Sequence, residues 1–207
     1  MKKDTNADSR GDYHIRSLYF DDYNDSALFE KQSGILKRKK YRIRIYNMSD
    51  SVIKLEKKSR IGQFINKDSL LINRKQTDSI LESNFSFLKK EKNKLAREFY
   101  FDIKTKKFAP KVIVDYVREA YTLNFNRIRI TFDKHLKTGL GRTDMFNSKL
   151  PLINAVDEPF CILEIKFSNM LPDYIKSVLQ LESSQRLAIS KYVFSRKFTK
   201  YRSWEDQ

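Results

Sequence analysis

Two neighbouring stretches decide the fold of this chain: residues 40–47, which read KYRIRIYN, and residues 51–58, which read SVIKLEKK. In both stretches charged and apolar residues alternate, which is the period of a β-strand with one buried face. Residues 47–50 (NMSD) lie between them and have the composition of a tight turn. The two stretches are therefore predicted to form an antiparallel β-hairpin.

The rest of the chain is predicted to add further strands and several helices. Extended patterns occupy residues 13–20, 63–71, 111–116, 119–124, 127–133 and 161–167, and residues 137–149 are expected to form a loop. Helical spacing occupies residues 25–32, with Asp25 as the N-cap, and residues 74–82, 87–107, 171–181 and 189–200. We therefore expect an α+β fold in which helices pack outside an antiparallel sheet of roughly eight strands.

Length and composition are those of one globular domain. The 207 residues are 40% hydrophobic, and residues 1–12 are polar enough to be a disordered leader, so residues 13–207 are expected to form a single domain. The one cysteine, Cys161, cannot form an internal disulfide, which indicates a reducing compartment. No run of about 20 apolar residues could span a bilayer. We expect a cytoplasmic protein without a membrane segment in this chain.

The net charge points to an anionic partner. Lys and Arg number 42 against 26 for Asp and Glu, which gives a formal charge of +16. A charge this far from zero opposes compaction through self-repulsion, so an anion that neutralises it stabilises the fold. Nucleic acid, an anionic membrane and a phosphate-rich small substrate all satisfy this requirement.

Four strands carry a charged face opposite an apolar one. The charged faces comprise Lys40, Arg42 and Arg44; Lys54, Glu56 and Lys58; Arg127, Arg129, Thr131 and Asp133; and Glu164 with Lys166. In an ordinary half-exposed sheet such faces point to water. Here they are strongly basic, and Glu56 and Glu164 each precede a lysine by two residues, which favours the alternative that the faces line a shared interior.

A cavity lined in this way suits a phosphate chain. Arginine binds phosphate oxygens with two parallel N–H groups, and lysine adds a point charge. A divalent cation that bridges phosphates needs hard oxygen ligands, so one or two carboxylates belong among the basic residues. If the sheet closes into a barrel, its interior becomes a tunnel for anions.

The motifs that carry these faces resemble a known family. YHIRSLYFDD, KYRIRIYN, KLEKK, RITFD, CILEIKF and the late ISKY follow, in order and spacing, the pattern of a VTC-type polyphosphate polymerase domain of the CYTH-like triphosphate tunnel superfamily. The resemblance extends over residues 13–196. It implies an antiparallel β-barrel closed by a C-terminal helix, in which the terminal phosphate of a nucleoside triphosphate is transferred to a polyphosphate chain with Mn²⁺ or Mg²⁺.

The resemblance and the strand faces together give ten expected site residues. These are Arg42, Arg44, Lys58, Arg129 and Lys191 as catalytic phosphate contacts; Lys67, Lys166 and Arg127 as further phosphate ligands; and Glu164 and Glu56 as metal ligands. Glu56 and Lys166 are assigned by the face that they share with the motif residues.

The chain departs from the family pattern at its start. Family members usually open with a further strand that carries a lysine for the phosphate chain, and no such pattern precedes YHIRSLYFDD here. An open seam leaves unpaired strand edges, so a homo-oligomer that completes the barrel is expected. Three other functions stay open: a non-catalytic polyphosphate-binding module, a triphosphate hydrolase of the same fold, and a nucleic-acid-binding barrel, although no nucleic acid is expected as the partner.

Overall fold

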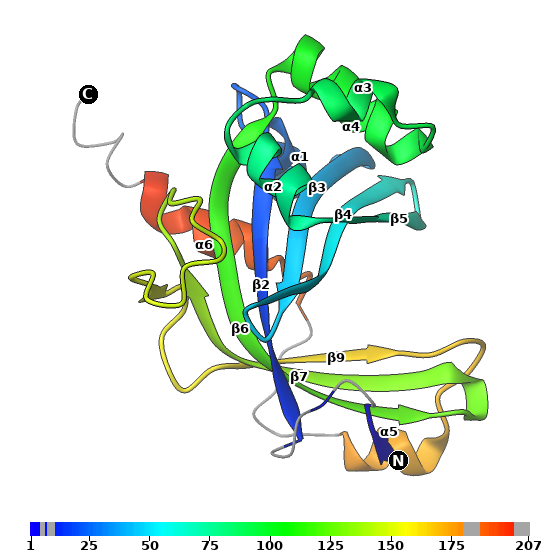
Figure 1. The fold of residues 1–207 in the computed structure, drawn as a ribbon. Helices are drawn as coiled ribbons and strands as arrows, with labels where there is room; N and C mark the ends of the chain where they lie inside the picture. Colours follow the sequence, from blue (N-terminus) through cyan, green and yellow to red (C-terminus); the bar gives the residue numbers. More distant parts are fainter. Residues whose placement is uncertain (5–6, 8–10, 180–186, 201–207) are drawn as a thin grey trace.

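The computed structural model describes residues 1–4, 7, 11–179 and 187–200 (Figure 1). One sheet of nine strands dominates this part of the chain. The strands are β1 (Lys2–Lys3), β2 (Asp12–Asp21), β3 (Lys37–Tyr46), β4 (Ser49–Ile61), β5 (Phe64–Ile72), β6 (Ala109–Leu123), β7 (Ile128–Thr138), β8 (Ile153–Asn154) and β9 (Cys161–Lys166). The helices are α1 (Ser26–Gln32), α2 (Arg74–Leu81), α3 (Ser86–Lys90), α4 (Lys94–Lys106), the 3-10 turn η1 (Phe125–Arg127), α5 (Asp173–Val178) and α6 (Lys191–Lys200).

The predicted α+β class is confirmed, but the sheet is curled rather than closed. Its order is β5-β4-β3-β2-β6-β7, with β8 and β9 paired to β7 and β1 paired to β6, and every pairing is antiparallel. Figure 1 shows the β4–β5 flank and the β7–β9 flank bending toward the same side. Within the described residues β5 pairs only with β4 and β9 only with β7, so the expected barrel closure is wrong.

The outer face of the sheet is packed against helices. Leu18, Ile43 and Leu55 from three adjacent strands are fully buried against Ile80 of α2 and Phe99 of α4. Their alternation with charged residues along each strand buries one face completely. This side of the sheet therefore supplies the main hydrophobic core.

Helix α6 covers part of the inner face, whereas α5 packs on the outer face of the sheet. Tyr192 of α6 is 1% exposed and stacks on Tyr19 of β2, with ring centroids 5.1 Å apart. Near β7, α5 places Ile175 against Ile128 and Ile130, which point away from the inner face. The helix expected at residues 189–200 is thus present as α6 and packs on the sheet, whereas residues 180–181 of the other predicted C-terminal helix lie outside the described part of the chain.

Several predicted boundaries differ from the observed ones. Residues 111–116 and 119–123, predicted as parts of two strands, belong to the single strand β6, which ends one residue before the predicted end at residue 124. Strand β7 continues through residue 138 into the predicted loop. The leader is not wholly disordered, because Lys2 and Lys3 pair with Thr122 and Tyr121 of β6. No helix in the described part of the chain is both long and apolar enough to cross a bilayer.

Helix α1 is capped by residues other than the predicted one. Asp25 has a left-handed backbone (φ 54°), and its side chain makes no capping hydrogen bond. Instead Asp21 accepts hydrogen bonds from the backbone N–H groups of Ala27 (2.9 Å) and Leu28 (3.1 Å), and Asp22 accepts one from Ser26 (2.8 Å). The two carboxylates therefore satisfy the free N–H groups at the start of the helix from the end of β2.

Candidate functional site

The pairing register gathers charged residues from β2, β3 and β4 on the inner face. Arg42 lies directly opposite Tyr19 on β2 and Glu56 on β4, and Lys40 lies opposite Lys58. Directly paired residues share one face of a sheet. Glu56 is 2% exposed and the side chain of Arg42 is 21% exposed, whereas Lys58 is exposed. The charged residues therefore share the inner face of the curled sheet, where Arg42 and Glu56 are shielded from water and Lys58 is not.

Glu56 is the centre of the first cluster of charges. Its Oε2 accepts a 2.7 Å hydrogen bond from Arg42 Nε and lies 3.9 Å from Arg44 Nη1, while its Oε1 lies 2.5 Å from Lys67 Nζ. Burial alone would raise the pKa of the Glu56 carboxyl, but Arg42, Arg44 and Lys67 lower it to about 2. The carboxylate is ionised and fully engaged by cations, so it holds the arginine and lysine side chains in place.

Tyr19 and Lys40 extend this cluster, although neither was among the expected site residues. Arg42 Nη1 donates a 2.8 Å hydrogen bond to Tyr19 Oη. Burial raises the pKa of the Tyr19 phenol, but Arg42, Arg44 and Lys40 outweigh burial and bring the pKa to about 8. Burial likewise lowers the pKa of Lys40 to about 8. The lowered pKa of Tyr19 reflects the three cations around its phenol.

A second cluster joins β6, β7 and α6. Arg118 donates two hydrogen bonds to Asp133, from Nε at 2.6 Å and from Nη2 at 2.8 Å, and Lys191 Nζ lies 2.5 Å from the same carboxylate. Lys191 Nζ also lies 5.0 Å from the centroid of the Tyr116 ring. Because Arg44 Nη2 donates to Tyr116 Oη (3.3 Å), the first and second clusters are continuous.

Arg118 was missed because the sequence prediction ended one strand at Tyr116 and started the next at Glu119. The strand is continuous in the structure, with a register shift against β7 between Asp115 and Val117. Val112, Val114, Tyr116 and Arg118 alternate along β6. Following that alternation past Tyr116 would have placed Arg118 on the inner face.

Glu164 and Lys166 approach from the opposite flank, on β9. Glu164 is 39% exposed, and its oxygens lie 3.4 Å from Lys166 Nζ and 3.9 Å from Arg118 Nη2. Burial raises the pKa of Glu164, but Lys166, Arg118 and Lys191 lower it below its usual value. Burial lowers the pKa of Lys58 on β4, and Glu164 partly opposes that effect. Lys58 and Glu164 therefore influence each other electrostatically across the curl of the sheet.

Two of the expected arginines lie at the margin. Arg129 lies opposite Lys166 and contacts Asp4 Oδ2 (2.6 Å) and Tyr13 Oη (3.0 Å), so its guanidinium connects the N-terminal residues to the sheet. Arg127 is exposed in the 3-10 turn before β7, with a φ of 48°. The prediction that Arg127 faces inward assumed that β7 begins one residue earlier than it does, and it is wrong.

The sequence match agrees with this geometry. Residues 1–200 match the VTC domain family. The chain belongs to that family. The family prediction is therefore confirmed over almost the whole chain. No curated protein matches the sequence significantly.

Solved structures show the fold that this VTC domain shares. A crystal structure of a protein from Bacillus halodurans, provisionally named an adenylate cyclase, superposes with a TM-score of 0.51 and 11% sequence identity, covering 88% of this chain and 81% of that one. A protein from Pyrococcus horikoshii OT3 gives a TM-score of 0.35 with 13% identity, covering 82% of this chain and 71% of that one. The first comparison shows that the two proteins share a fold, and the second carries no argument.

A divalent metal fits this VTC domain at one of the two expected carboxylates. Mg²⁺ and similar ions are commonly held by one or two carboxylates, with substrate phosphates and waters completing the shell. Glu164 is half exposed on the inner face and fits that role. Glu56 does not fit, because three cations already surround its buried oxygens. Across the residues that the structure describes, no three His, Cys, Asp or Glu side chains gather as a metal site.

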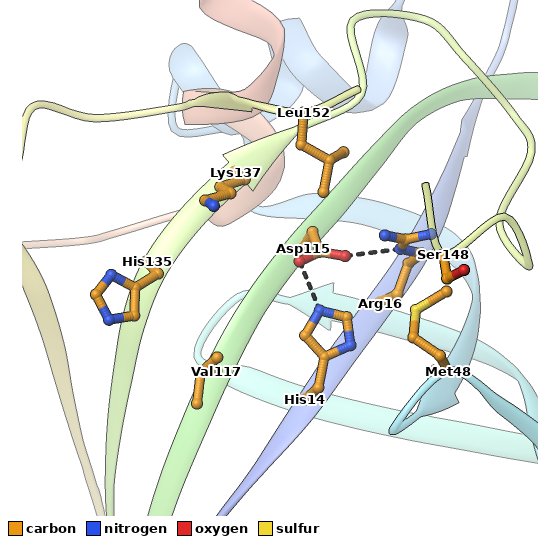
Figure 2. Close-up of a pocket in the computed structure, with 9 residues that line it drawn as sticks. All are labelled: His14, Arg16, Met48, Asp115, Val117, His135, Lys137, Ser148 and Leu152. Carbon is orange, nitrogen blue, oxygen red and sulfur yellow. Dashed lines mark hydrogen bonds and ion pairs between the residues drawn. The ribbon is translucent and has the colours of Figure 1, made fainter. Parts of the chain in front are cut away.

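A cavity of about 330 Å³ in this VTC domain lies away from these clusters, at the loop that follows β7 (Figure 2). Asp115 is central to its wall, with His14 Nε2 at 2.6 Å and Arg16 Nε at 2.7 Å. Arg16 Nη1 also donates to the carbonyl of Asn147 (2.7 Å), so the network fastens residues 139–152 to the sheet. None of the ten expected site residues lines this cavity.

Proposed function

We propose that this VTC domain transfers the terminal phosphate of a nucleoside triphosphate to a polyphosphate chain held along the inner face, with Mn²⁺ or Mg²⁺. One observation carries the proposal: cations from elements far apart in the sequence converge on the inner face of the curled sheet. They are Lys40, Arg42 and Arg44 from β3, Lys58 from β4, Lys67 from β5, Arg118 from β6, Lys166 from β9 and Lys191 from α6. A linear phosphate chain presents the matching row of negative charges.

The carboxylates of the two clusters prepare the cations for such a ligand. Glu56 fixes Arg42, and Asp133 fixes Arg118 through both oxygens, so neither guanidinium has to be ordered when a phosphate binds. Phosphoryl transfer demands chiefly that the reacting groups be positioned and that their charge be stabilised. Lys58 and Lys166 approach from opposite flanks, and their ammonium groups can adjust to the position of the polyphosphate chain.

Glu164 is the proposed protein ligand for the metal. A divalent cation bound there supplies charge neutralisation between neighbouring phosphoryl groups. Lys166 lies beside Glu164, so a phosphate oxygen near the metal is also within the field of an ammonium group. We assign no metal role to Glu56.

The test is to incubate the purified protein with ATP and either Mn²⁺ or Mg²⁺ and to separate chain products on a gel. Lys58→Ala and Glu164→Gln are expected to lower polymer formation by about 10-fold or more, because the first removes a cation that contacts the phosphates and the second weakens the proposed metal ligand. Lys90→Ala is the matched control, since Lys90 is exposed on α3 in the outer helical layer. Absence of both polymer and triphosphate cleavage with either metal would contradict the proposal.

A non-catalytic polyphosphate-binding module is the second candidate. Glu56 and Asp133, two of the carboxylates on the inner face, are engaged by cations. Of these two and Glu164, only Glu164 is left accessible to a metal, which favours binding without catalysis. That candidate predicts retention of polyphosphate without turnover. A triphosphate hydrolase of the same fold instead predicts release of orthophosphate without polymer, so one set of reactions separates the three. Completion of the curled sheet by a second copy stays a prediction, which the mass of the protein in solution tests.

A further inference from the structure

The tip of the β4–β5 hairpin exposes a group of large apolar side chains. Phe64 is 84% exposed, Ile61 63%, Leu36 60% and Ile65 58%, and we call these four residues, with Ile35, the apolar tip. Ile61 lies directly opposite Phe64, and Gly62 N–H donates to the carbonyl of Leu36 (3.1 Å). The segment before β3 therefore lies against the hairpin turn, which makes the apolar side chains neighbours. Adjoining exposed apolar residues of this kind mark interaction surfaces.

Positive charges border the apolar tip. Arg38 on β3 lies directly opposite Arg60 on β4, a pairing of like charges that destabilises a sheet when nothing neutralises it. Arg60 Nε donates to the carbonyl of Gly62 (2.7 Å), and Arg38 Nη1 donates to the carbonyl of Ile35. Both guanidinium groups are thus held at the turn. We call Lys31, Lys37, Arg38 and Arg60 the basic rim.

Among the residues that the structure describes, no carboxylate forms an ion pair with the basic rim. Burial and then Arg60 lower the pKa of Arg38, and these effects outweigh the nearby Glu30. Burial, Arg38 and Arg60 also lower the pKa of Lys31. Burial and the neighbouring guanidinium groups together disfavour the charged forms of Arg38 and Lys31. An external anion at this place would relieve the repulsion.

We propose that the apolar tip and the basic rim dock the protein on an anionic lipid bilayer. The interface of such a bilayer offers an acyl boundary for protruding apolar side chains and negative headgroups for the lysines and arginines around them. A second copy that paired through this same surface is disfavoured, because it would bring two basic rims together. A protein partner needs a pocket shaped to the tip, whereas a bilayer accepts a projecting side chain such as Phe64 without a preformed complement.

Sedimentation with lipid vesicles tests the proposal. Vesicles of phosphatidylcholine mixed with phosphatidylserine are expected to retain the wild type, and vesicles of phosphatidylcholine alone are expected to retain much less. The double variant Ile61→Ser, Phe64→Ser is expected to lose about 10-fold or more in affinity for the mixed vesicles, because two large apolar side chains no longer leave water. Phe101→Ser is the matched control, since Phe101 is 63% exposed on α4 and lies outside the tip.

The apolar contribution separates docking from simple charge attraction. Equal retention of the wild type and the Ile61→Ser, Phe64→Ser variant would show that net charge alone adsorbs the protein, and the proposal would be wrong. Failure of mixed vesicles to retain the wild type would also overturn it and leave an acidic protein as the partner of this surface. Free polyphosphate competes for the cations of the basic rim. It is expected to release both the wild type and the Ile61→Ser, Phe64→Ser variant from the vesicles, but the wild type should still bind more tightly than the variant.

Insertion of the tip can be observed directly. Phe64→Trp in a Trp204→Phe background places a single tryptophan at the apolar tip. Its fluorescence is expected to shift to shorter wavelength on mixed vesicles and to be quenched by lipids brominated on the acyl chain. An unchanged spectrum on vesicles that retain the protein would contradict insertion. Polymer formation from ATP is expected to be unaffected, because no residue of the tip belongs to the proposed phosphate site.

Discussion

The sequence pattern around Glu56 is compatible with two roles for its carboxylate: a metal ligand, or an anchor for neighbouring cationic side chains. Among lysines and arginines on a shared strand face, a carboxylate is an expected metal ligand. The structure instead surrounds it with Arg42, Arg44 and Lys67 and leaves it 2% exposed. A buried carboxylate with this many cations is an anchor for their side chains. Glu164 has the same Glu-x-Lys spacing but remains half exposed, and only it keeps the accessibility that a metal requires.

The low pKa of Glu56 leads to a prediction about acid stability. The folded-state pKa is about 2, against an ordinary value of 4.5, so its contribution is fully present above pH 4.5 and is lost as the pH falls toward 2. The expected loss is about 3 kcal/mol in the free energy of unfolding. Urea unfolding at several pH values, for the wild type and for Glu56→Gln, measures it. The variant is expected to be less stable at neutral pH and to lack this part of the acid dependence; identical slopes would contradict the assignment.

At the scale of elements, one carboxylate fastens three of them together. Asp133 on β7 accepts two hydrogen bonds from Arg118 on β6 and contacts Lys191 at the start of α6. Asp133 is 1% exposed, so all three charges depend on this arrangement. The helix that covers one end of the inner face is thus positioned by the same group that orients an arginine of the proposed site. Asp21 acts similarly, since it caps α1 and also accepts a hydrogen bond from Tyr192 Oη of α6 (2.6 Å).

Asp133→Asn is therefore expected to lower the free energy of unfolding by about 3–5 kcal/mol, because it leaves Arg118 and Lys191 without their buried partner. Urea unfolding measures the effect. Asp173→Asn is a matched control, because the ion pair of Asp173 with Lys176 on α5 is exposed and should contribute little. A double-mutant cycle with Lys191→Met is expected to show coupling between Asp133 and α6. Strictly additive effects would show that the helix is held by other contacts.

At the scale of the whole molecule, the curl of the sheet brings cations from several strands together on the inner face. Lys58 on β4 and the pair Glu164 and Lys166 on β9 belong to opposite flanks, yet both residues of the pair affect the pKa of Lys58. The outer face is meanwhile occupied by the hydrophobic core and by α2, α3 and α4. The cations named above are accordingly gathered on the inner face rather than spread evenly over the sheet.

This distribution predicts how ligands change stability. A polyphosphate chain at about 100 times its dissociation constant is expected to raise the free energy of unfolding by about 2.7 kcal/mol, because it binds only the folded protein. Orthophosphate at the same phosphorus concentration should raise it less, since it spans fewer cations. Added salt should reduce the effect by screening. Chemical unfolding with each ligand measures the shifts, and equal shifts for the two ligands would argue against an extended site on the inner face.

Much of this protein follows from its sequence, because strand alternation is a local property. The two-residue period of residues 40–47 and 51–58 determined which side chains share a face, and the pairing of Arg42 with Glu56 follows once the hairpin forms. Arg127 and Arg118 show where local information fails. One was placed on the inner face by a strand boundary in error by a single residue, and the other was lost to a break that β6 does not have.

The sequence alone determined the antiparallel α+β class, the alternating faces, the surplus of cations and the membership of the VTC family. Only the tertiary structure decided that the sheet curls without closing, that Glu56 anchors cations while Glu164 remains accessible, and that apolar residues gather at the β4–β5 tip. The physical reason is that alternation fixes the side of a strand on which a residue lies. Exposure and charge partners depend on segments brought together from distant parts of the chain.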